Sequence, residues 1–376
     1  MHAGIWVNQP RLSRLLSLDI FRGLTVALMI IVNSPGNELP YAWLEHSTWD
    51  GCTFADVVFP FFIFIVGVSL VFPLTNARNK GMTAKDLLPG ILKRTFIIFF
   101  IGLLLNAFPY HFDLSTLRFY GVLQRIALCY FAASLLFLTT SVKAQSILVV
   151  IILLGYWFIM VGPIPGFGAH DLSPDGNTAA YLDRLIFSSA HLYGKIFDPE
   201  GLLSTLPSIA TALIGNLTGV WLLSSHSQRM KFNSMLLVSI TLMILGWAWG
   251  FSFPINKALW TSSFVLWTCG LGLLSFAVCY WLVELKAWTK VFKPFQLLGT
   301  HALLAYVLHV FFLKLQFMIK LEKADGSLEN LKSFICDYLF GWASSPNASL
   351  LYSITYALLW IVVVTILNKR SSSPAH

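Results

Sequence analysis

Long apolar segments separated by short polar ones run along most of the chain. They cover residues 15–31, 57–74, 95–108, 119–138, 146–161, 205–223, 235–253, 260–283, 295–319 and 350–367. A helix needs roughly 20 mostly apolar residues to cross a bilayer, and most of these segments approach that length. The pattern therefore predicts an all-α, polytopic integral membrane protein with about ten transmembrane helices.

Composition and charge agree with a membrane protein. The chain is 57% hydrophobic and only 11% charged, whereas soluble domains carry about 25% charged residues. Its net charge of +8 comes from basic residues such as Arg78, Lys93 and Lys286, which gather in alternate gaps between apolar segments. Since basic residues favour the cytoplasmic side, both termini are expected there and residues 33–56 outside. The charge thus indicates orientation in a membrane, not binding of nucleic acid.

Two longer segments interrupt the apolar pattern of what we expect to be a single domain, residues 1–376. Residues 163–203 are rich in Gly, Pro and Asp and predict a long extracytoplasmic loop, while residues 334–342 predict a short interfacial helix. The five cysteines show no metal-binding or redox spacing, so no metal site is expected. Cys52 and Cys336 are both predicted outside, and whether they pair stays open.

The polar residues 44–56 lie between the first two predicted spans and contain His46. Histidine takes and gives protons near neutral pH, so a histidine at a membrane boundary is a candidate for proton-transfer chemistry. The alternative is an ordinary solvated loop histidine. The residues alone leave both interpretations open.

Charged residues inside the predicted spans are the second candidate feature. Asp19, Arg22 and Asn33 fall near one face of the first span. Either Asp19 and Arg22 form an ion pair that fixes the helix, or all three residues line a passage across the membrane. Arg125 in the fourth span needs an anionic partner, which is Asp19, Asp56 or a phosphate of a ligand.

Several motifs together resemble the heparan-α-glucosaminide N-acetyltransferase family, part of the wider group of transmembrane acyltransferases. They are RLLSLDIFRGLT at 14–25, Asn33, HSTWDG at 46–51, DVVFPFFIF at 56–64, GVLQRI at 121–126, DPEGLL at 198–203, PINKALWTSS at 254–263 and YVLH at 306–309. The resemblance implies a membrane enzyme that moves acetyl from cytosolic acetyl-CoA to an amino sugar on the far side. The chain starts close to its first span, which resembles bacterial members and implies the bacterial inner membrane.

The resemblance also implies that His46 is catalytic and that Asn33 lies beside it. His46 would act as the base that deprotonates the amine, or would carry the acetyl group itself. The Asn33 amide suits an oxyanion or the thioester carbonyl. Asp56 would hold the second imidazole nitrogen, as the third member of a catalytic triad does.

Basic and aromatic residues complete the expected site. The predicted acetyl-CoA contacts are Arg22, Lys93, Arg94, Gln124 and Arg125, although positive-inside topology alone accounts for the cytoplasmic cations. The predicted contacts with the acceptor are Trp49, Glu200, Asn256, Lys257 and Trp260; an interfacial aromatic belt explains the tryptophans equally well. A homodimer is compatible with this interpretation. The alternative functions are a transporter of an amino sugar or lipid-linked sugar, and an O-acyltransferase for an envelope polysaccharide.

Overall fold

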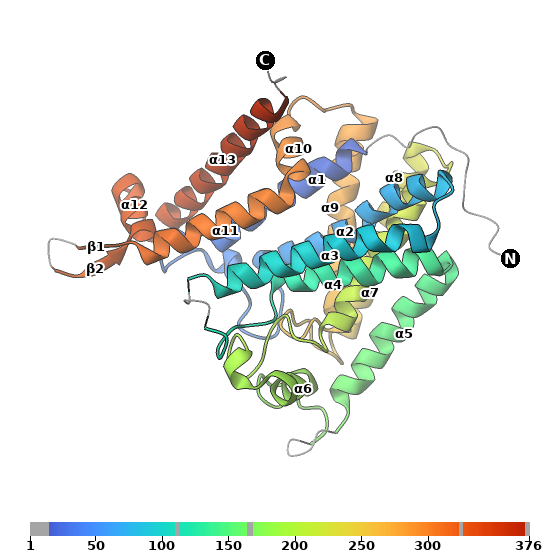
Figure 1. Ribbon diagram of the computed structural model, residues 1–376, viewed down its shortest axis with the longest axis horizontal. Helices are drawn as coiled ribbons and strands as arrows, with labels where there is room; N and C mark the ends of the chain where they lie inside the picture. Colours follow the sequence, from blue (N-terminus) through green and yellow to red (C-terminus); the bar gives the residue numbers. More distant parts are fainter. Residues whose placement is uncertain (1–14, 110–112, 164–167, 323–325, 373–376) are drawn as a thin grey trace. The chain divides into compact units, whose positions relative to one another are not determined.

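The computed structural model describes residues 15–109, 113–163, 168–322 and 326–372 (Figure 1). Contacts group these residues into two compact units. Unit 1 contains residues 48–52 and 59–277, and unit 2 contains residues 16–47, 53–58 and 278–372. The expectation of a single domain stays a prediction.

Unit 1 is a bundle of long apolar helices. Its elements are α2 (Phe54–Asn79, from Phe59 onward), α3 (Ala84–Ala107), α4 (Val122–Thr139), α5 (Val142–Val161), α6 (Thr178–Phe187), α7 (Thr205–Leu223), α8 (Gln228–Trp249) and α9 (Ser262–Tyr280, to Ala277). Helix α3 packs on α4, and α7 packs on both α4 and α5. A Cβ atom at Gly67 of α2 would lie 2.0 Å from the Ala212 carbonyl of α7. Small residues therefore let these two helices pack backbone against backbone.

Unit 2 is built around α1 (Leu16–Asn33), which packs on α10 (Lys293–Thr300) and α13 (Ser345–Ser372). A Cβ at Gly299 would lie 1.9 Å from the Asp19 carbonyl, so α1 and α10 also meet through their backbones. The unit adds a π-helical stretch (Trp281–Leu285), α11 (Ala302–Met318), strands β1 (Lys320–Glu322) and β2 (Leu328–Asn330), and α12 (Leu331–Phe340). The strands form an antiparallel hairpin next to α12 (Figure 1).

The helical membrane architecture predicted from the pattern is confirmed. Among the described residues, nine helices are long and apolar enough to cross a membrane, or ten if one bent pair counts as a single span. Helix α12 confirms the predicted short helix, whereas the hairpin before it was not predicted. The segment 163–203 is not simply a loop, because it contains α6.

The predicted single span 295–319 is wrong in one respect. It consists of two helices, α10 and α11, that meet at His301 with a bend of 83°. The Thr300 hydroxyl donates to the Leu297 carbonyl at 2.8 Å, and His301 Nδ1 lies 3.1 Å from the same oxygen. Side chains that bind nearby carbonyls compete with the helical ladder, which favours a break here. All five cysteines are described and carry thiols, and a pairing of Cys52 with Cys336 stays an open question.

Candidate functional site

His46 and Asp56 form a direct pair in unit 2. The Nδ1 atom of His46 lies 2.8 Å from Oδ1 of Asp56. Asp56 is fully buried, whereas the His46 side chain is 51% exposed. One partner of the pair is thus fixed inside the protein while the imidazole presents a face outward.

The start of α2 positions the Asp56 carboxylate. Its Oδ2 atom accepts hydrogen bonds from the backbone amides of Ser47 and Thr53, each at 3.0 Å. The Thr53 hydroxyl lies 3.0 Å from the same oxygen and donates to the Glu45 carbonyl at 2.6 Å. A carboxylate in the first turn of a helix is also favoured by the helix dipole. Residues directly before and inside the first turn of α2 therefore hold Asp56, which in turn orients His46.

This geometry fixes the chemistry of the imidazole. With Asp56 accepting from Nδ1–H, the lone pair of the neutral ring is on Nε2. A half-exposed imidazole in that tautomer can remove a proton from a small molecule, and the buried carboxylate stabilises the imidazolium that forms. The arrangement is suited to general base catalysis.

Asn33 is the last residue of α1 and is exposed. Of the three predicted catalytic residues, His46 and Asp56 are thus in direct contact. Asn33 lies at the end of α1, where the loop that contains His46 begins.

Arg22 is occupied by contacts within unit 2. Its Nη1 atom lies 3.1 Å from Oδ1 of Asp19 and 3.3 Å from the Gly299 carbonyl oxygen. The ion-pair interpretation of Asp19 and Arg22 therefore describes the observed geometry. On α3 in unit 1, Lys93 and Arg94 are both exposed, and the guanidinium of Arg94 lies 4.9 Å from the ring centroid of Tyr130.

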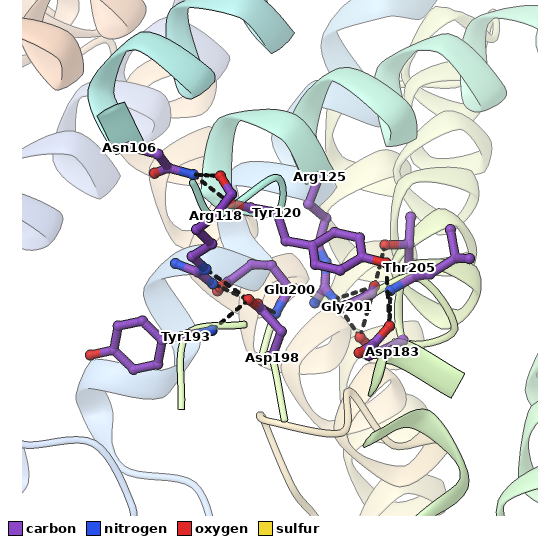
Figure 2. Close-up of polar contacts among 12 residues, drawn as sticks. Asn106, Arg118, Tyr120, Arg125, Asp183, Tyr193, Asp198, Glu200, Gly201 and Thr205 are labelled. Carbon is purple, nitrogen blue, oxygen red and sulfur yellow. Dashed lines mark hydrogen bonds and ion pairs between the residues drawn. The ribbon is translucent and has the colours of Figure 1, made fainter. Parts of the chain in front are cut away.

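A second polar cluster lies within unit 1, where Arg118 binds two carboxylates (Figure 2). Arg118 donates from Nε to Oδ2 of Asp198 at 2.7 Å and from Nη2 to Oδ1 at 2.6 Å, and it also pairs with Glu200. The Tyr193 amide donates to Asp198 Oδ2 at 3.0 Å. Burial opposes the charge of Arg118, but the hydrogen bonds that it donates to Asp198 and the charge of Glu200 raise its pKa above its ordinary value. The paired geometry is the strong, bidentate kind.

Asp183 of α6 is the buried acid of the same cluster. Its Oδ1 accepts from the Leu202 amide at 2.9 Å and from the Tyr120 hydroxyl at 3.3 Å, while its Oδ2 has no partner. Burial raises the pKa of Asp183 to about 6, and the nearby charge of Asp198 adds to the shift. A Cβ at Gly201 would lie 1.8 Å from Asp183 Oδ2, so any larger residue there would displace this carboxylate.

Arg125 is buried at the start of α4 with two donor groups unused. Its Nη2 donates to the Gly201 carbonyl at 3.2 Å and to the Ser204 hydroxyl, and its guanidinium lies 5.0 Å from the Trp260 ring centroid. Its Nε and Nη1 atoms have no partner. Within unit 1, a carbonyl, a hydroxyl and an indole hold Arg125, and its pairing with Asp19, Asp56 or a ligand phosphate stays a prediction. Gln124 is also buried, with its Nε2 unpartnered. Unused buried donors fit an anionic or carbonyl ligand.

Two of the five predicted acceptor contacts, Trp260 and Asn256, are buried in the protein. Trp260 is 1% exposed, packed between Arg125 and the rings of Phe59 and Phe264. Asn256 is fully buried, donating to Asp50 at 3.1 Å and accepting from the Leu259 amide at 2.9 Å. Neither has surface for a sugar in this conformation, so both position other groups.

The remaining predicted acceptor contacts are more accessible. Trp49 is partly buried, donates from Nε1 to the Leu172 carbonyl at 2.9 Å and lies edge-on to Phe197. Lys257 is partly buried, and Glu200 is engaged by Arg118. Arg118, Asp183 and Asp198 were missed as site residues, although Asp198 and Glu200 stand together in the quoted motif at 198–203.

Comparison with known proteins agrees with these motifs. A family model described as the catalytic region of heparan-alpha-glucosaminide N-acetyltransferase matches residues 14–248. The human protein named heparan-alpha-glucosaminide N-acetyltransferase is 29% identical over 420 residues, covering 95% of this chain and 59% of its own length. The mouse protein of the same name is 28% identical over 415 residues, covering 95% of this chain and 60% of its own length. The chain thus spans about three-fifths of these relatives.

Proposed function

The chain belongs to the heparan-α-glucosaminide N-acetyltransferase catalytic family, and on that premise we propose that it acetylates an amino sugar or another glycan at the extracytoplasmic side of a membrane. The acetyl donor is acetyl-CoA from the cytosol. The observation that carries the proposal is the His46–Asp56 pair at 2.8 Å, which lies inside the region that the family matches. The expected membrane is the bacterial inner membrane.

His46 acts in this proposal as the base or as the acetyl carrier. As a base, its Nε2 takes the proton that the amine loses while the nitrogen attacks the thioester carbonyl. The carbon–sulfur bond then breaks, and the CoA thiolate leaves and takes a proton. As a carrier, Nε2 itself attacks the thioester carbonyl, the carbon–sulfur bond breaks and the CoA thiolate leaves. The amine then attacks the acetyl-imidazolium, the bond from Nε2 to the acetyl carbon breaks, and Nε2 takes the amine proton, which passes to the thiolate. Asn33 donates its amide hydrogens to the developing oxyanion.

Cationic side chains and buried hydrogen-bond donors of the protein suit acetyl-CoA. Acetyl-CoA carries phosphates and amide groups, which suit the exposed Lys93 and Arg94 and the unused donors of Arg125 and Gln124. Arg22 contributes less directly, because Asp19 and Gly299 already occupy it. Trp49, Glu200 and Lys257 are the proposed acceptor contacts, with Asn256 and Trp260 supporting the segments around them.

Acetyl transfer is tested with purified protein, labelled acetyl-CoA and a panel of amino sugars. His46→Ala is expected to lower the rate about 10²–10⁴-fold, the range for loss of a general base. His170→Ala removes another exposed loop histidine and is the matched control. A His46→Ala variant with the full wild-type rate would remove His46 from the mechanism.

Two other functions give different results in the same system. A transporter of an amino sugar would move its substrate into vesicles with no acetyl-CoA present. An O-acyltransferase would yield an ester instead of an amide, which mass spectrometry of the product distinguishes. The paired imidazole and carboxylate favour transfer chemistry over transport.

A further inference from the structure

An apolar groove of about 620 Å³ lies within unit 1, between α5, α7, α8 and α9. Its walls include Val149 and Leu153 of α5, Ile214 of α7, Val238 and Leu245 of α8, and Leu266 of α9. All four helices are among those long and apolar enough to cross a membrane. The groove is therefore open to an apolar ligand at membrane depth, and it contains none of the residues of the proposed acetyl-transfer site.

The groove is long enough for a lipid chain. On α8 its lining runs from Ser234 to Trp249, which is roughly 22 Å of helix at about 1.5 Å per residue. The hydrocarbon of one bilayer leaflet is about 15 Å deep, half of the full core. One acyl chain that starts at the membrane surface is accommodated along this length.

Cationic side chains surround one end of the groove, which we call the basic end. Lys231 precedes the lining residue Ser234 by one helical turn, and its Nζ donates to the Leu222 carbonyl at 2.7 Å, beside the lining residue Trp221. On α5, Lys143 precedes the lining residue Ser146 by one turn and is exposed. The ammonium groups thus lie where the apolar lining ends.

The backbone adds to the positive potential there. Helices α5 and α8 both begin at the basic end, capped by Ser141 and Ser227. Helix N-termini favour anions. Residues 141–161 and 214–249 contain no Asp or Glu, whereas they contain Lys143, Arg229 and Lys231. The charge is complementary to an anion and has no acidic residue within these segments to neutralise it.

We propose that the groove binds an anionic phospholipid, with one acyl chain along the apolar wall and the phosphate between Lys143 and Lys231. The apolar wall alone would accept any lipid chain, and the basic end alone would accept any phosphate. Their continuity selects a molecule that carries both. The site is independent of acetyl transfer and adds a specific lipid to the partners of the protein.

The test uses purified, delipidated protein in neutral detergent. Native mass spectrometry and thermal unfolding are followed while phosphatidylglycerol, phosphatidylcholine or glycerol phosphate is added. Phosphatidylglycerol is expected to bind and raise the unfolding temperature more than phosphatidylcholine does, and glycerol phosphate alone is expected to do neither. Equal effects of the two lipids would overturn the proposal, and so would an effect of glycerol phosphate equal to that of the lipid.

Variants separate this groove from the general positive surface. The Lys143→Gln/Lys231→Gln pair is expected to weaken phosphatidylglycerol binding roughly tenfold to thirtyfold, since each juxtamembrane cation attracts an anionic lipid. Glutamine removes the charge at 231 while keeping a hydrogen-bond donor at the end of the side chain. The control, Lys80→Gln/Lys85→Gln, removes two exposed lysines elsewhere in unit 1. Equal weakening in both pairs would overturn the proposal.

A third pair of variants tests the apolar wall without any change of charge. Val238→Trp places an indole in the groove, and Leu237→Trp places it on the neighbouring exposed position of α8, which does not line the groove. Val238→Trp is expected to abolish retention of the lipid while Leu237→Trp leaves it intact. Retention that is unchanged in Val238→Trp would show that the chain lies elsewhere. The lipid comparison in the wild-type protein decides the question even where a variant fails to fold.

Discussion

Replacing Asp56 by Asn tests whether the carboxylate acts through the tautomer of His46. The substitution keeps the size of the buried side chain but leaves one acceptor oxygen in place of two. In the wild type, Asp56 Oδ2 accepts hydrogen bonds from the backbone amides of Ser47 and Thr53 and contacts the Thr53 hydroxyl. Its Oδ1 accepts a hydrogen bond from His46 Nδ1. Several donors therefore compete with a single imidazole for the remaining oxygen.

The hydrogen bonds at the helix start decide the orientation of the new amide. Two or three bonds of about 1 kcal/mol each outweigh one, so the Asn oxygen turns toward Ser47 and Thr53. The amide NH₂ then faces His46 Nδ1, which must become an acceptor. The proton moves to Nε2, and the lone pair that would take the substrate proton is lost. A wrong tautomer of this kind costs about 10²–10⁴ in rate.

The assay is acetyl transfer from labelled acetyl-CoA, with kcat and KM measured separately. Asp56→Asn is expected to lower kcat by that factor with little change in KM for acetyl-CoA, because the residue is buried and away from solvent. Glu38→Gln, an exposed acid in the same loop, is the control and should keep the wild-type rate. Adding Asp56→Asn to His46→Ala should cost almost nothing more, since residues that act as a unit are not additive. A double variant much slower than His46→Ala, or a single variant at full rate, would refute the reasoning.

Three further predictions concern stability. Burial raises the pKa of Asp183 to about 6, above its unfolded value of about 3.9. Relative to Asp183→Asn, the free energy of unfolding of the wild type should therefore fall by roughly 3 kcal/mol as pH rises from about 4 to about 6, and no further above that. A difference in unfolding temperature between the two proteins that stays constant across this range would contradict the prediction. Gly299→Val should unfold at a lower temperature, because its Cβ would lie 1.9 Å from the Asp19 carbonyl and overpacking costs about 1–3 kcal/mol or more. An unchanged unfolding temperature would show that α1 and α10 can move apart without cost. Arg118→Gln should destabilise the protein by about 3–5 kcal/mol, since it leaves the buried Asp198 carboxylate without its cation, and the Arg118→Gln/Asp198→Asn double variant should recover part of that loss.

Sequence reasoning was sufficient where the signal is local. Segment length and hydropathy predicted the spans, because apolar helices of membrane length have few alternative environments. The pairing of His46 with Asp56 was also predicted, from the role that a carboxylate takes beside a catalytic imidazole. The bend at His301 was missed because hydropathy does not register how Thr300 and His301 bind the Leu297 carbonyl.

Sequence reasoning failed where partners come from distant segments. Arg125 was expected to meet an anion, either a carboxylate of the protein or a ligand phosphate, and the sequence did not predict its contacts with Gly201 and Ser204, more than seventy residues further on. No local pattern reports which carbonyl will meet a buried guanidinium. Trp260 is similar: an aromatic residue in an outer segment is typical of an interfacial belt, and only packing shows that its ring is buried under Arg125.

The His46–Asp56 pair and the cluster around Arg118 differ in how far apart along the chain their hydrogen-bonded residues lie. They should therefore respond differently to substitution. The hydrogen bonds that join Asp56 to His46, Ser47 and Thr53 link residues at most ten positions apart, so variants there should change catalysis with little loss of the fold. The hydrogen bonds that the side chains of Arg118, Tyr120 and Arg125 donate join segments 63 to 82 positions apart, so they close long loops as well as orient side chains. Variants in that cluster should therefore lower both stability and activity, and a loss of activity there assigns a chemical role only when the protein remains folded at the assay temperature.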